Sequence, residues 1–135
     1  EGLQDLADMV VYRDDALTLL AATIPPNFTA APHEHNMWAA ISVYDGQEDN
    51  VFYERVAGAA GLREAHRMSV VAPGVVQLER DAVHTIHNPR ATPLRALHAY
   101  GGDLLAVPRS TWTKDAAGNY VEQPFDWSKV KDGGK

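Results

Sequence analysis

The chain has 135 residues, a formal net charge of −6 at pH 7 and no cysteine. This length suits one domain with a hydrophobic core. The acidic balance argues against nucleic acid as a partner, because no cluster of lysine or arginine is present to neutralise phosphates. The absence of cysteine excludes disulfides, thiolate metal ligands and cysteine nucleophiles, so a bound metal would need histidine, aspartate or glutamate.

The sequence also lacks the features of a membrane protein. It contains no run of about eighteen or more apolar residues, the length that a membrane-spanning helix requires. It shows no secretory signal pattern of a basic segment followed by an apolar one. We therefore expect a cytoplasmic protein with no membrane partner, present as a monomer or a homodimer.

The predicted elements are short strands separated by turns. After a short segment typical of a helix end, Leu3–Asp8, the apolar runs that predict strands are Met9–Tyr12, Leu17–Ile24, Met37–Tyr44, Val51–Val56, Arg63–Val71, Val75–Leu78 and Leu94–Tyr100. Segments with turn chemistry separate them, among them Pro25-Pro26-Asn27 and Asp45-Gly46. Strands at this spacing predict an all-β sandwich or barrel with a ligand pocket in its mouth.

The C-terminal stretch differs in composition from the rest. It is richer in glycine, aspartate and lysine and carries Tyr120, Phe125 and Trp127. We predict a single domain over residues 1–135, with a core from about residue 9 to 112. Residues 113–135 are then an extended arm that packs its aromatic side chains on the barrel.

Two groups of histidines, about fifty residues apart, indicate a metal site. His33 and His35 lie two residues apart, and since a strand alternates its side chains between two faces, both imidazoles can point to one metal. His84 follows the apolar run Val75–Leu78, and an antiparallel barrel could bring it alongside the pair. His87 lies at an odd offset from His84 and is expected to face the other way. His66 alternates among charged residues and is expected to be exposed.

These spacings resemble those of the cupins, which are double-stranded β-helix barrels. Their first motif is His-x-His, then a glutamate after three or four residues, then a glycine. His33, His35 and Gly46 match it, but Ala39 or Ala40 stands at the glutamate position. The second cupin motif ends in His-x-x-x-Asn, which His84 and Asn88 match, and this spacing favours His84 over His87 as the third ligand. We expect Asn88 itself to be a structural turn residue.

A cupin with three histidines and no glutamate resembles the cysteine dioxygenase group of thiol dioxygenases and the related predicted metal-dependent double-stranded β-helix enzymes. The likeness covers roughly Tyr12 to Trp112 and includes His98 and Tyr100 on the last core strand. In thiol dioxygenases that strand carries Ser-x-His-x-Tyr, a hydrogen-bond relay beside the iron. Here Ala96 replaces the serine. A cysteine-tyrosine crosslink is impossible, because the chain has no cysteine.

The resemblance implies a mononuclear Fe(II) held by His33, His35 and His84, with His98 and Tyr100 as catalytic residues. The implied reaction adds O₂ to a small thiol, or to a related small anionic substrate, at the metal. Some members bind the substrate carboxylate through an arginine on an early strand, and Arg13 is the candidate by position. Trp38, directly after the ligand pair, is a candidate wall of the substrate pocket.

Other interpretations remain open at this stage. Imidazole also suits Zn, Ni, Mn or Cu, so the site could serve a Lewis-acid isomerase or hydrolase. The barrel could instead bind a small ligand without catalysis, because fold alone does not assign chemistry. Glu48, expected at a hairpin turn, is solvated in one interpretation and a replacement ligand or an acceptor for a histidine N–H in another.

Overall fold

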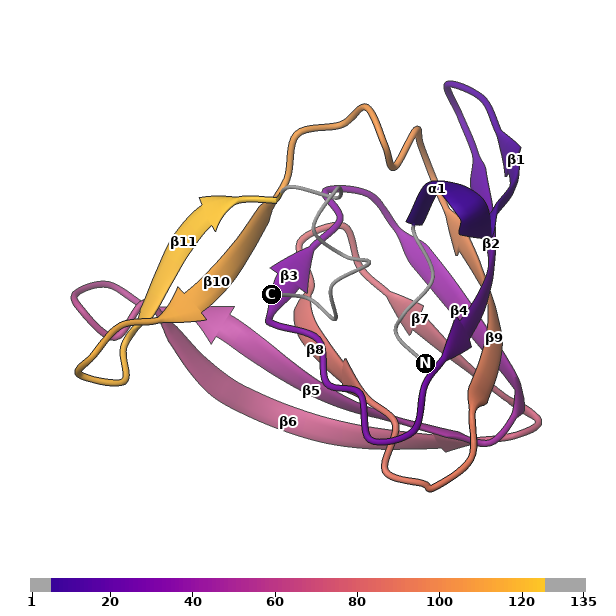
Figure 1. Cartoon of the computed structure of the whole chain (residues 1–135). Helices are drawn as coiled ribbons and strands as arrows, with labels where there is room; N and C mark the ends of the chain where they lie inside the picture. The colour runs from indigo at the N-terminus through magenta and orange to yellow at the C-terminus, as the bar shows by residue number, and fades with distance from the viewer. Residues whose placement is uncertain (1–5, 126–135) are drawn as a thin grey trace.

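The computed structural model describes residues 6–125, which form two antiparallel sheets that face each other across a common interior (Figure 1). One short helix precedes eleven strands within that range. The elements are α1 Leu6–Met9, β1 Val10–Arg13, β2 Thr18–Ile24, β3 His33–Glu34, β4 Ala39–Asp45, β5 Gln47–Arg55, β6 Leu62–Val71, β7 Gly74–Leu78, β8 Val83–His87, β9 Leu94–Tyr100, β10 Ser110–Lys114 and β11 Tyr120–Pro124.

The strand order interleaves segments that are far apart in the chain. One sheet has the order β1-β2-β9-β4-β7 and the other β11-β10-β3-β8-β5-β6. The chain passes from the first sheet to the second between β4 and β5 at Gly46, whose φ is 94°. A side chain there would also lie 3.2 Å from the carbonyl oxygen of Pro93. The predicted turn at Asp45-Gly46 is confirmed, and this backbone needs glycine.

The core comes from strands whose side chains alternate between interior and surface. Every second residue of β2 is buried, from Thr18 through Leu20 and Ala22 to Ile24, and β4 and β9 show the same period of two. The expected all-β architecture is confirmed. Among the described residues, no helix is long and apolar enough to cross a bilayer.

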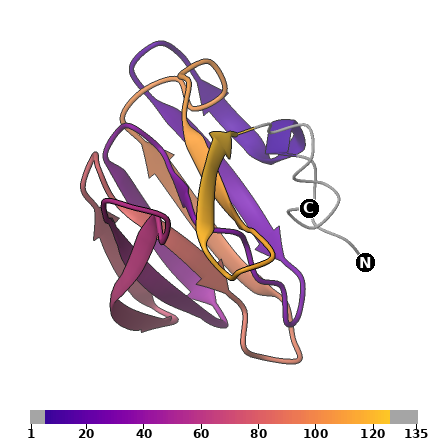
Figure 2. The ribbon, with the colours of Figure 1, turned by 90° about the vertical axis from the view of Figure 1, so that its left-hand side faces the viewer.

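Several predicted element bounds differ from the observed ones. β5 begins at Gln47 rather than Val51. Val83–His87 forms a strand, β8, that the pattern of apolar runs did not predict. The first five residues and Trp127 lie outside the described residues. The predicted arm is, over its described part, the hairpin β10–β11, which extends the second sheet by pairing Thr111 with His33. Figure 2 shows this hairpin in front of the two sheets.

The two-residue strand β3 is held in the sheet by the buried carboxylate of Glu34. This carboxylate accepts hydrogen bonds from the guanidinium of Arg55 and from the backbone N–H of Ser110, the latter at 3.0 Å. One residue earlier than His33, the carbonyl of Pro32 accepts bonds from Thr111 and Trp112. Glu34 therefore ties β3 to β5 on one side and to β10 on the other, and this fixes the backbone that carries His33.

Glu48 is not the solvated turn residue that one interpretation expected. It lies in β5 and is fully buried, because the early start of this strand turns the side chain into the interior. Its Oε2 accepts a hydrogen bond of 3.1 Å from Asn50, whereas Oε1 has no partner. Burial raises the pKa of Glu48 to about 7, partly opposed by the bond from Asn50.

Asn88 is a structural residue, as expected. It is fully buried, and its Nδ2 donates to the backbone oxygens of Ile24, Pro25 and Thr92 over 2.9 to 3.2 Å. Its Oδ1 accepts a 3.0 Å bond from the N–H of Arg90. One side chain thus links the end of β2 to the connection between β8 and β9 and satisfies backbone groups that the strands leave unpaired.

Replacing Asn88 by alanine should lower the free energy of unfolding by about 2–4 kcal/mol, because it leaves several buried backbone groups without partners. Urea unfolding followed by circular dichroism measures the change. Gln77→Ala, on the exposed face of β7, is the control and should stay within about 0.5 kcal/mol of the wild type. A loss in Asn88→Ala no larger than in the control would contradict the assigned role.

Glu48→Gln should remove a pH dependence of stability. Because folding raises the pKa of Glu48 from 4.5 to about 7, the folded chain keeps a proton that the unfolded chain releases, so stability is lost as pH rises from about 4.5 to 7. The full loss corresponds to about 3 kcal/mol. Urea unfolding of metal-free protein at pH 4.5 and pH 8 should show this loss in the wild type relative to Glu48→Gln. Equal losses in both proteins would refute the assignment.

Candidate metal centre

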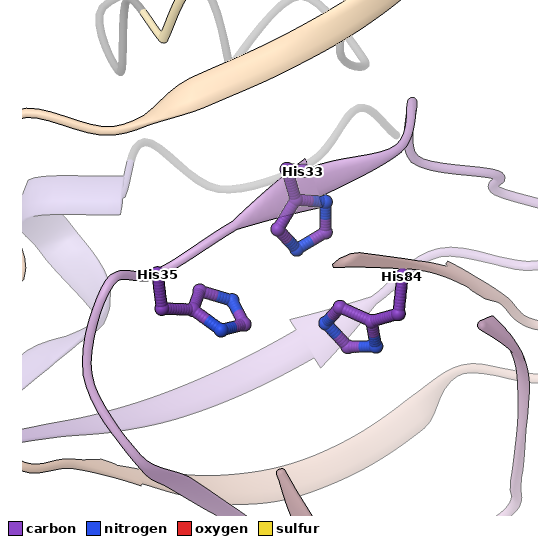
Figure 3. Close-up of side chains that lie close together, drawn as sticks. All are labelled: His33, His35 and His84. Atoms are coloured by element: carbon purple, nitrogen blue, oxygen red, sulfur yellow. The ribbon is translucent and has the colours of Figure 1, made fainter. Parts of the chain in front are cut away.

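The structure brings His33, His35 and His84 together at one end of the barrel interior. His33 on β3 lies directly opposite His84 on β8, and His35 follows β3 by one residue. One ring nitrogen from each lies within 4.8 Å of the other two. The ring centroids are 4.7 to 5.2 Å apart, and the three imidazoles point toward a common space (Figure 3). The arrangement predicted from the sequence is present.

Hydrogen bonds determine which ring nitrogens of His33 and His84 are free to bind a metal. Nδ1 of His33 lies 2.9 Å from the carbonyl oxygen of Ala31, and Nδ1 of His84 lies 3.0 Å from Oδ1 of Asn50. Each Nδ1 therefore carries the proton and donates it, which leaves Nε2 with a free lone pair. Nε2 of His84 and Nδ1 of His35 are buried without a partner. Buried polar atoms without partners in native proteins need an explanation, and a metal ion supplies one here.

The three imidazoles are neutral, which is the form that binds metal. Burial lowers the pKa of His33 to about 4, and the pKa values of His35 and His84 lie well below the ordinary histidine value for the same reason. The neighbouring imidazoles add to the effect on His35 and His84, because two positive charges would repel in a site of low polarity. The donor set therefore fits a divalent ion that prefers nitrogen ligands, such as Fe, Zn, Cu or Ni.

A chain of polar side chains lies behind His84. Asn50 accepts from the imidazole through Oδ1 and donates through Nδ2 to the carboxylate of Glu48. Both residues come from β5, which pairs with β8. Glu48 is thus not among the clustered metal-binding side chains but acts on His84 through Asn50, and this fixes both the tautomer and the orientation of the ring.

The candidate centre opens into a mostly apolar cavity of about 230 Å³. His98 and Tyr100 line it together with His33 and His35, and Nδ1 of His98 lies 2.9 Å from the hydroxyl of Tyr100. Burial lowers the pKa of His98 to about 4 and raises the pKa of Tyr100 above its ordinary range, so both groups are neutral at pH 7. The sequence prediction that these two residues share a cavity with the histidines is confirmed.

Tyr100 occupies the neighbourhood of the absent cupin glutamate. The sequence left Ala39 and Ala40 open for that position, and the structure turns Ala39 inward and Ala40 outward. Ala39 pairs with Tyr100 across β4 and β9. A small residue beside the tyrosine leaves interior room at the position where the cupin motif has a glutamate, so a phenol lies there in place of a negative charge.

The structure does not bring Arg13 or Trp38 into the cavity. The guanidinium of Arg13 is exposed and pairs with Asp103 through bonds of 2.7 and 3.1 Å, because β1 lies at the edge of its sheet with its side chains outward. Trp38 is half exposed, with its indole beside Gly101. The expectations that Arg13 binds substrate and that Trp38 forms a wall of the pocket are corrected.

Two side chains that the sequence analysis did not single out for the site do line the cavity. Arg109 and Phe125 line the cavity, with the guanidinium carbon 3.8 Å from the centroid of the phenyl ring. Sequence reasoning missed Arg109, although it alternates with Thr111 and Thr113, which also line the cavity. The alternation of Arg109, Thr111 and Thr113 on one side of a strand was the signal in the sequence that could have identified Arg109. His66 is exposed as expected, and His87 faces away from the centre, bonded to Thr29 and the carbonyl of Phe28.

No protein-family model and no curated protein matches the chain. Solved structures do. The cupin domain of Cnp3 from Schizosaccharomyces pombe is 11% identical with a TM-score of 0.58, and the match covers 71% of this chain and 64% of that one. A cupin superfamily protein from Desulfitobacterium hafniense is 12% identical, with a TM-score of 0.57 over 70% of this chain and 75% of that one.

A third similar structure is hydroquinone 1,2-dioxygenase from Sphingomonas sp. TTNP3 with 4-hydroxybenzoate bound. It is 13% identical, and the match, with a TM-score of 0.55, covers 70% of this chain and 65% of that one. Identities this low establish the fold rather than the activity. The topology, the two facing antiparallel sheets and these similarities together show that this chain has the double-stranded β-helix fold of the cupins.

Proposed function

We propose that this protein is a mononuclear non-heme Fe(II) dioxygenase that adds O₂ to a small thiol or a related small anionic substrate. The observation that carries the proposal is the convergence of three neutral imidazoles, those of His35 and His84 buried and that of His33 partly buried, beside a mostly apolar cavity that His98 and Tyr100 also line. The hydroquinone 1,2-dioxygenase among the similar structures supports it, since this fold accommodates dioxygenase chemistry.

His33, His35 and His84 would hold the iron, and they supply no negative charge. When bound, the ion would provide a dicationic centre that attracts an anionic substrate and permits reaction with O₂. For a thiol, both atoms of O₂ would be added to sulfur, which takes RSH to RSO₂H. The remaining lining residues keep bulk water away from the reacting atoms, because most of them are apolar.

The pair formed by His98 and Tyr100 would handle a proton beside the centre. The phenol stays protonated because burial raises its pKa, and its O–H can donate to Nδ1 of His98 over 2.9 Å. That tautomer places the imidazole proton on Nε2, which is buried without a protein partner. Nε2–H can then donate a hydrogen bond to an oxygen of the substrate.

The metal site predicts a loss of iron in His84→Ala. Protein purified without oxygen and loaded with Fe(II) should contain close to one iron per chain, and His84→Ala should retain little, because one of three ligands is gone. Elemental analysis measures the content. His87→Ala is the matched control, since it lies on the same strand and its imidazole is bonded elsewhere.

Oxygen uptake by the loaded wild type, measured with an electrode across a panel of small thiols, tests the reaction. We expect uptake that depends on a thiol and is absent in His84→Ala. Zinc or nickel in the protein as purified, with no oxygen uptake after loading with Fe(II), would refute the oxygenase and favour a Lewis-acid enzyme. Protein that takes up no metal would leave a ligand-binding barrel.

Asn50→Leu should weaken metal binding by about 10- to 100-fold, because it removes the acceptor that fixes the His84 tautomer. Competition between the protein and a chelator for Co(II) measures the affinity, and circular dichroism checks the fold. Gln77→Leu, on the exposed face of β7, is the control and should leave the affinity unchanged. An unchanged affinity in folded Asn50→Leu would contradict the orienting role.

A further inference from the structure

Arg109 is the one permanently charged residue that lines the cavity within the described part of the chain. It lies in the connection directly before β10, and the alternation of this segment turns Arg109 to the same side as Thr111 and Thr113. No aspartate or glutamate lines the cavity in residues 6–125. A fixed positive charge therefore faces an apolar space that holds no negative side chain.

The contacts that the structure gives Arg109 leave most of its donors unused. Nη1 reaches the backbone oxygen of Glu34 over a long 3.4 Å, and the guanidinium lies over the ring of Phe125. The carboxylate of Glu34 is already bonded to Arg55, Ser110 and Asn36. Among the described residues, Arg109 forms no ion pair, whereas Arg13 and Arg55 each have a carboxylate partner.

This arrangement is costly unless a ligand completes it. Burial lowers the pKa of Arg109 only to about 10, so the group remains charged at pH 7. The nearby carboxylate of Glu34 raises the pKa of Arg109, but it is bonded to Arg55 and Ser110, so within residues 6–125 the partly buried guanidinium has no ion pair of its own to replace its lost hydration. The face of Phe125 holds the guanidinium plane in place, which preserves its two-pronged donor geometry for a planar anion.

Arg109 is also close to the candidate metal ligands. Its charge contributes to the lowered pKa values of His33 and His35, and the same charge acts on Tyr100. An anion bound to Arg109 would therefore lie at the metal end of the cavity. Much of the remaining lining is apolar, with Leu6 and Met9 from α1, Leu20 and Ile24 from β2, and Leu104.

The size of the cavity limits the ligand. Its volume of about 230 Å³ is below the range of about 300–1,000 Å³ typical of sites for drug-sized molecules. An apolar cavity of about 150 Å³ is enough to bind benzene. The space therefore suits one ring or a short branched chain with a single short polar arm.

We propose that Arg109 binds the carboxylate of a small substrate whose remaining body is apolar and uncharged. The inference rests on the proposed function in that it names the substrate class of the same cavity. It excludes free amino acids, since an ammonium group would enter a cavity with no acidic side chain among the described residues. Arg109 is then a specificity-determining residue, in the role that the sequence had assigned to Arg13.

Calorimetric titration with 3-phenylpropionate, 3-phenylpropanamide and L-phenylalanine tests the inference. The full chain is used in two forms, stripped of metal with a chelator and loaded with Zn(II). In both forms the wild type should bind the carboxylate about ten- to a hundredfold more tightly than the amide, because only the carboxylate forms charge-assisted bonds with Arg109. L-Phenylalanine should bind as weakly as the amide.

Arg109→Gln should abolish the preference for the carboxylate over the amide, and Arg109→Lys should retain only part of it, because lysine keeps the charge but not the fork. Arg13→Gln is the matched control and should keep the full preference. Equal binding of carboxylate and amide by the wild type, or no binding of either, would overturn the inference without any variant. A preference seen only with Zn(II) and kept in Arg109→Gln would mean that the carboxylate binds the metal, which overturns the inference but not the metal site.

Discussion

The pairing of β3 with β8 is the contact on which the rest of the site depends. It places His33 directly opposite His84, and the chain continues from β3 into His35. Burial then keeps all three imidazoles neutral, because a charged ring in this interior would lose its hydration and meet its neighbours' charge. The free ring nitrogens face one another, and two of them, Nδ1 of His35 and Nε2 of His84, are buried without a hydrogen-bond partner. Register and desolvation together produce a set of candidate metal ligands.

A strand of two residues cannot secure this register alone. The buried carboxylate of Glu34 does so by binding Arg55 of β5 and the backbone of Ser110 in β10. On the other side of the centre, Asn50 and Glu48 set the orientation of His84. Polar groups are expensive in an apolar interior unless they are bonded. Their presence around these histidines indicates that the fold gives up some stability to hold the rings in one arrangement.

The charged residue that lines the cavity, and part of the cavity wall, come from segments outside the core of the barrel. The hairpin β10–β11 extends the second sheet, and the connection before it and the residue after it contribute Arg109 and Phe125. The family resemblance had placed a substrate contact on Arg13, and the position after the ligand pair had suggested Trp38 as a wall of the pocket. Those side chains point away because β1 is an edge strand and because the indole of Trp38 lies beside Gly101. The candidate metal ligands thus match the family pattern, whereas the side chains that line the remainder of the cavity do not.

The sequence by itself determined whatever depends on local alternation and spacing. Short apolar runs separated by turn segments predicted the strands, Asp45-Gly46 predicted a turn, the histidine spacing identified His33, His35 and His84, and the family resemblance added His98 and Tyr100. The tertiary structure alone decided which side of the chain closes the cavity. Arg109 lines the cavity and Arg13 does not, because the pairing of β10 with β3, far away in the chain, turns the segment around Arg109 inward. The burial of Glu48 was decided in the same way, because the start of β5 is set by its pairing with β6 and β8 and not by its own polar residues.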